Sequence, residues 1–131
     1  MPLFKLEQFF FINLQYGNVS NELREFSLKY GVVVHEIPNI DIYNDIDGLV
    51  ALVDACDLVV TTSNVTAHIA GSINKETCLI APKVLGSIWY WHEFDENSIW
   101  YPSIKIFRQS KFYELTSSVN AIVKFLESKN L

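Results

Sequence analysis

Residues 57–71 read DLVVTTSNVTAHIAG. The first six are almost continuously apolar, as expected for a strand that is covered on both faces of a sheet. The polar pair Ser63-Asn64 then marks a turn, and the residues from Val65 to Ser72 predict a short helix. A buried strand that runs into a helix is typical of α/β proteins with a parallel sheet.

The same alternation continues on both sides of this stretch. Further strands are expected at residues 9–14, 32–37, 77–80 and 104–107. Helices are expected from a cap at Asn18 or Ser20 to a stop at Gly31, from Asp45 to Ala55, and from about Thr116 to Ser128. Alternating strands and helices imply parallel strands joined by crossovers. The predicted fold class is therefore α/β, a Rossmann-like three-layer domain with a mainly parallel sheet of about five strands.

Composition and charge exclude several classes of protein. The 131 residues are half hydrophobic and 19% charged, which predicts one globular domain over residues 1–131. The net charge of −5 argues against non-specific binding to nucleic acid or to a membrane surface. No apolar run is long enough for a membrane span, and the N-terminus does not resemble a signal peptide. Cys56 and Cys78 are interpreted as reduced core thiols, and a cytoplasmic location is expected.

The turn after residue 62 carries the clearest chemistry. Ser63, Asn64 and Thr66 place two hydroxyls and an amide where a strand ends and a helix begins, and His68 follows within about a turn. The first N–H groups of a helix lack internal partners and favour an anion such as a diphosphate. Two other interpretations stay open: Ser63 and Asn64 are ordinary helix caps, and His68 is a hydrogen-bonded structural residue.

Other site types are not indicated. The loop after the first expected strand reads LQYGN at residues 14–18, so it lacks the glycine pattern of dinucleotide-binding proteins. Walker and G-x-S-x-G motifs are absent, and the three histidines lack the spacing of zinc ligands, so no metal site is predicted. Residues 83–102 show no clear periodicity but hold many aromatic residues, which suggest a pocket wall or a buried interface: Trp89, Tyr90, Trp91, Phe94, Trp100 and Tyr101.

Several motifs together resemble the heptosyltransferase-like glycosyltransferases of glycosyltransferase family 9. Residues 57–71 are similar to their donor-binding segment, and the closest likeness is to versions at the C-terminus of bacterial tetratricopeptide-repeat proteins. Further matches lie at residues 13–17, 45–57, 100–103 and 107–109, and Trp91 also matches. The resemblance covers the chain from about Phe9 to its end. It departs at Ser63 and Asn64, where many family members carry Asp and Thr.

The resemblance implies the C-terminal half of a GT-B enzyme, which binds a nucleotide-diphosphate sugar as donor substrate and needs no other cofactor. It places Ser63, Asn64, Val65, Thr66 and His68 around the diphosphate. Gln15 and Tyr16 would lie on the facing loop.

The catalytic residue is not identified, and the acceptor half would be an N-terminal domain outside this sequence. On this basis the isolated chain is expected to be inactive. The alternatives are a stand-alone or degenerate nucleotide-binding module without catalysis, and a structural domain whose aromatic segment forms a homodimer interface.

Overall fold

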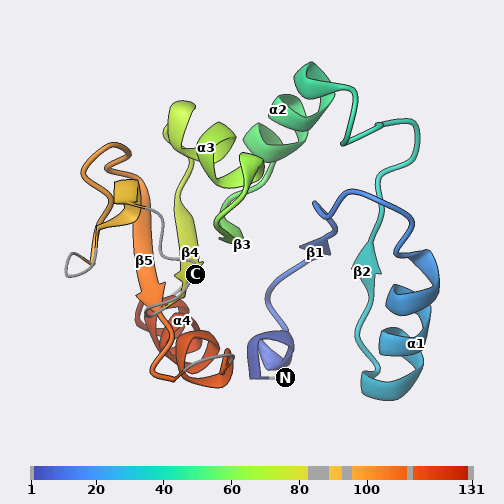
Figure 1. Cartoon of the computed structure of the whole chain (residues 1–131). Helices are drawn as coiled ribbons and strands as arrows, with labels where there is room; N and C mark the ends of the chain where they lie inside the picture. Colours follow the sequence, from blue (N-terminus) through green and yellow to red (C-terminus); the bar gives the residue numbers. More distant parts are fainter. Residues whose placement is uncertain (1, 83–88, 93–95, 112–113, 130–131) are drawn as a thin grey trace.

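The chain folds into a mixed α/β structure (Figure 1). The computed structural model describes residues 2–82, 89–92, 96–111 and 114–129. The strands are β1 (Phe11–Ile12), β2 (Val34–His35), β3 (Val59–Thr62), β4 (Thr77–Ala81) and β5 (Ile104–Arg108). The α-helices are α1 (Ser20–Tyr30), α2 (Ile46–Ala55), α3 (Val65–Ser72) and α4 (Thr116–Ser128), and two 3-10 helices are η1 (Pro2–Lys5) and η2 (Trp89–Trp91).

The five expected strands are all present and each pairing is parallel, but they are divided between two sheets. β3, β4 and β5 form one sheet in that order, with Val59 opposite Thr77 and Thr77 opposite Ile104. β1 and β2 form a separate pair of two residues each. The expectation of a single sheet of about five strands is therefore wrong. An apolar run predicts that a strand is buried, but the strand it pairs with is a long-range property that the run does not carry.

Helices cover both faces of the three-stranded sheet. Because side chains alternate along a strand, Leu79 and Ala81 of β4 face α3, while Cys78 faces α4. On the α3 side, Leu79 packs with Ala67 and with residues of β5. On the α4 side, Cys78 packs in one cluster with Ile122, and that cluster also contains Leu6, just beyond η1. This part of the chain has the three-layer arrangement that the alternation predicts.

Local signals set the start of α2 and the end of α1, but not the start of α1. The side chain of Asp45 accepts a hydrogen bond from Gly48 N–H at 2.8 Å and caps α2. Gly31 ends α1 with a left-handed φ of 68°, as expected for a glycine stop. The expected cap of α1 at Asn18 or Ser20 is wrong: Val19 occupies that position and no side chain caps the helix. Ser20 instead donates its hydroxyl to Glu36, 16 residues away.

Packing is uneven along the chain. Helix α2 buries Leu49, Leu52 and Val53. By contrast, α1 buries none of its residues, and its Phe26 makes an edge contact with Phe4.

Among the described residues no helix has the length and apolar character that a bilayer crossing requires.

Candidate functional site

The turn between β3 and α3 is built around Asn64. Its backbone is extended, with φ −154° and ψ −177°, and its side-chain Oδ1 accepts a hydrogen bond from Ala67 N–H at 3.2 Å. The Thr61 hydroxyl shares its proton between the same oxygen, at 3.2 Å, and the main-chain oxygen of Thr62, at 3.3 Å. The interpretation of Asn64 as a helix cap is thus confirmed. Because the amide oxygen is occupied by two donors, the amide NH₂ is the part of Asn64 left to face a ligand.

Exposure varies strongly among the residues predicted to bind an anion. Asn64 and Val65 are exposed, and Ser63 and His68 are half-buried. Thr66 is only 8% exposed, because it lies on the same side of α3 as Ala70, which packs against α2. Of the residues predicted to lie around the diphosphate, Thr66 is therefore the least accessible.

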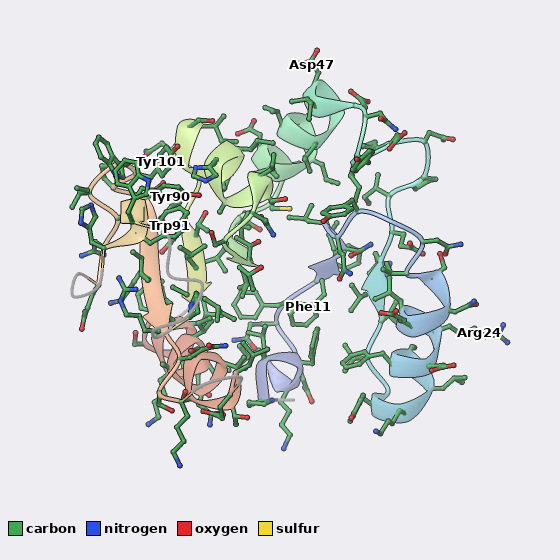
Figure 2. All side chains as sticks on the ribbon, viewed as in Figure 1. Phe11, Arg24, Asp47, Tyr90, Trp91 and Tyr101 are labelled. Carbon is green, nitrogen blue, oxygen red and sulfur yellow. The ribbon has the colours of Figure 1, made fainter. Side chains whose placement is uncertain are left out.

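His68 lies among three aromatic side chains that follow β4 in sequence. Its Nδ1 is 3.1 Å from the hydroxyl oxygen of Tyr101, and its Nε2 is 3.1 Å from that of Tyr90. Its ring stacks on Trp91, with centroids 5.3 Å apart and planes inclined by 23°. Figure 2 shows Tyr90, Trp91 and Tyr101 gathered beside α3. In this arrangement both ring nitrogens of His68 have a polar partner within the chain.

Trp91 connects this aromatic group to the turn. Its indole N–H donates to Ser63 Oγ at 2.9 Å, and its side chain is 1% exposed. Arg108, at the end of β5, donates to the main-chain oxygens of Trp91, at 2.8 Å, and of His92. The sequence indicates an aromatic segment here but not these partners, because Trp91 and Ser63 are 28 residues apart.

Other members of the aromatic segment face outward. Trp89 is 74% exposed and Trp100 is 56% exposed, and their rings meet edge to face with centroids 6.3 Å apart. Phe94, of the same aromatic group, lies outside the described residues. The segment is therefore partly a core element, through Trp91, and partly an exposed aromatic surface.

Gln15 and Tyr16 lie in the loop after β1. Asn13 shapes this loop, since its Oδ1 accepts from Gln15 N–H at 3.0 Å and its Nδ2 donates to Gln15 O at 3.3 Å. Tyr16 is exposed and its ring centroid lies 5.6 Å from that of Tyr43, in the loop after β2. These two loops border an open surface hollow of about 580 Å³, lined by Tyr16, Gly17, Asn18, Ile40, Asp41, Ile42 and Tyr43.

Asp41 is the charged residue among those that line this hollow. Its carboxylate accepts hydrogen bonds from the Asn44 side chain at 2.7 Å and from the backbone N–H groups of Tyr43 and Asn44. The Asn44 side chain, followed by these backbone bonds, holds the pKa of Asp41 below its usual value. None of residues 63–68 lines the hollow. The hollow therefore adjoins Tyr16 but not the predicted diphosphate contacts of residues 63–68.

The described part of the chain contains no candidate metal site. Within residues 2–82, 89–92, 96–111 and 114–129, no three His, Cys, Asp or Glu side chains lie close enough together to hold an ion.

Comparison with known proteins gives one partial similarity. The chain is 32% identical over 97 residues to Protein FlbA of Caulobacter vibrioides, and the match covers 74% of this chain but 16% of FlbA. The chain thus spans well under a fifth of the length of that relative. No family model matches the chain. No solved structure matches it either.

Proposed function

We propose that this chain is the nucleotide-diphosphate-sugar-binding half of a glycosyltransferase, with the diphosphate bound at the turn from Ser63 to Thr66. The observation that carries this proposal is an excess of hydrogen-bond donors at the turn. The side-chain oxygens of Ser63 and Asn64 already accept hydrogen bonds within the protein, whereas several donors of the turn have no partner among the described residues.

The donors of the turn follow from the hydrogen bonds that its side chains already make. Asn64 Oδ1 is occupied by Ala67 N–H and the Thr61 hydroxyl. An indole N–H can only donate, so Ser63 Oγ accepts from Trp91, and the Ser63 hydroxyl proton is left for another partner. Together with the Asn64 NH₂ and the N–H groups of Val65 and Thr66 at the start of α3, this proton makes a set of donors that an anion satisfies.

These donors suit the leaving group of glycosyl transfer. As the bond between the sugar and the diphosphate breaks, negative charge grows on the diphosphate, and fixed donors and a helix dipole stabilise that charge without rearranging. Gln15 and Tyr16 are the proposed second contact, from the loop after β1. Transfer to an acceptor, and the base that activates it, belong in this proposal to a further domain of a longer protein.

The first test is a search for the ligand. A thermal-shift panel of nucleoside diphosphates and nucleotide-diphosphate sugars should contain compounds that raise the unfolding temperature, because a ligand that binds only the folded state stabilises it. Failure of every compound, and of inorganic pyrophosphate, to bind would remove the proposal.

The second test locates the ligand at the turn. The substitution Asn64→Asp replaces a neutral donor by a negative charge, so affinity for the diphosphate should fall at least about tenfold, measured by calorimetric titration. The unfolding temperature should change little, because Asp caps helices about as well as Asn. The matched control is Asn74→Asp, which adds the same charge just beyond the opposite end of α3 and should leave the affinity unchanged. Equal affinities in parent and Asn64→Asp would place the anion elsewhere.

A further inference from the structure

His68 is positioned to act on the turn without touching a ligand. It is the fourth residue of α3, and a tyrosine hydroxyl lies 3.1 Å from each of its ring nitrogens. A neutral imidazole has one donor and one acceptor, and a tyrosine hydroxyl can serve as either partner. Both nitrogens are thus satisfied by Tyr90 and Tyr101, and the imidazole of His68 keeps its polar atoms turned toward the aromatic segment.

The surface of α3 is shaped to admit this arrangement. Gly71 is three residues after His68 and so lies on the same side of the helix. A Cβ added at Gly71 would come within 2.4 Å of the Tyr101 ring, which is closer than any real contact allows. The absence of a side chain at this position therefore lets Tyr101 reach His68.

The aromatic segment is in turn tied to the anion-binding turn. Tyr90, held by His68, is the direct neighbour of Trp91 in η2, and the Trp91 indole N–H donates to Ser63 Oγ. Arg108 holds the main-chain oxygen of Trp91 from the side of β5. The Trp91 ring is thus fixed by its stacking on His68, by Arg108 and by the buried cluster that it shares with Ala67 and Leu79.

We propose that His68 is a positioning residue: by holding Tyr90 and Tyr101 it fixes the Trp91 indole, which occupies the Ser63 oxygen and directs the Ser63 hydroxyl proton toward the bound anion. The part of this inference that concerns the anion rests on the proposed function. The part that concerns the Trp91 indole does not, and it can be measured in the ligand-free protein.

The decisive variant is His68→Phe, which keeps a ring to stack on Trp91 and removes both hydrogen bonds. The readout is the Trp91 indole N–H signal in ¹⁵N NMR spectra, one of three such signals since the chain has three tryptophans, and it is assigned by its loss in Trp91→Phe. In His68→Phe we expect this N–H to exchange with solvent at least about tenfold faster than in the parent, while the protein stays folded by circular dichroism.

The matched control is His35→Phe. His35 is also a half-buried histidine in a ring stack, with Phe10 at 3.9 Å between centroids, but it lies in β2. This substitution should leave exchange at the Trp91 indole unchanged. If His68→Phe does not fold, Tyr90→Phe removes a single hydroxyl and keeps every ring, and it should also accelerate the exchange. If exchange at the Trp91 indole is unchanged in His68→Phe, or in Tyr90→Phe where His68→Phe does not fold, the positioning role is overturned.

Pyrophosphate binding separates this inference from the proposed function. The affinity of the parent for inorganic pyrophosphate should fall about tenfold in Ser63→Ala and about three- to tenfold in His68→Phe, because a hydrogen bond to a charged group is lost or weakened. A parent that binds neither pyrophosphate nor any compound of the nucleotide panel defeats the proposed function, and if only a nucleotide binds, the variants are titrated with that nucleotide. A parent that binds either ligand, with His68→Phe equal in both affinity and indole exchange, defeats only the positioning role.

Discussion

Cys78 lies on β4, where its side chain is fully buried against α4, and these surroundings change the acidity of its thiol. Burial, with a smaller contribution from the carboxylate of Glu76, raises the pKa of the Cys78 thiol to about 12. The thiolate is the reactive form, so we expect iodoacetamide at pH 8 to modify Cys56, which is half-buried, well before Cys78 in the folded protein. Peptide mass spectrometry measures both rates, and the same reaction in urea, where the two should react alike, is the control.

The raised pKa of Cys78 also makes the free energy of unfolding depend on pH. The folded value lies above the ordinary value of 9.0, so between these two values the unfolded chain loses the Cys78 proton and the folded chain keeps it. The contribution of Cys78 to the free energy of unfolding is therefore complete below pH 9 and falls as the pH rises toward 12. Urea titrations from pH 8 to 11 should show a smaller decline in Cys78→Val than in the parent. An identical decline would mean that the thiol titrates normally in the folded protein.

In the turn between β3 and α3, the hydrogen bonds that could be predicted from sequence are those between residues close together in the chain. The cap at Asn64 joins residues three apart and follows from the strand, the polar pair and the helix in sequence. The bonds that join the turn and His68 to the aromatic segment are long-range: Trp91 reaches Ser63 across 28 residues, and Tyr101 reaches His68 across 33. Sequence periodicity carries no information about such pairs, and the segment between β4 and β5 has no periodicity at all.

At the scale of elements, α2 offers a direct test of a local signal. The Asp45 carboxylate accepts from Gly48 N–H, and a Cβ at Gly48 would come within 2.3 Å of that carboxylate. We expect Asp45→Ala to lower the free energy of unfolding by about 1 kcal/mol and Asp45→Asn to change it by only a few tenths. Chemical denaturation at constant pH measures both. A loss in Asp45→Asn as large as that in Asp45→Ala would contradict the role of the cap.

The elements also show which parts of the fold follow from sequence. The bounds of α3 and α4 coincide with their expected ranges, and β4 and β5 extend one residue beyond theirs. β1 and β2 are much shorter than the apolar runs that predicted them, at two residues each. A strand ends where its partner stops offering hydrogen bonds, and this depends on the neighbouring chain segment and not on the strand's own residues.

At the scale of the molecule, packing predicts a gradient of stability. β3, β4 and β5 contain buried side chains and are covered by α3 and α4, whereas α1 buries none of its residues and is followed by a strand of only two residues. Amide hydrogens exchange slowly where opening exposes much buried apolar surface and quickly where it exposes little. The segment from α1 to β2, residues 20–35, should therefore open without unfolding the three-stranded sheet.

Hydrogen exchange measured by mass spectrometry tests this gradient. After correction for intrinsic rates, amides of β4 should exchange at least about a hundredfold more slowly than those of α1, which corresponds to a difference of about 3 kcal/mol in opening free energy. Unstructured peptides of the same composition supply the reference rates. Leu79→Ala, which removes a fully buried side chain from the sheet, should raise the exchange of β4 strongly and that of α1 little, because α1 already opens independently. Equal protection of α1 and β4, lost together in this variant, would instead mean that the whole chain unfolds as one cooperative unit.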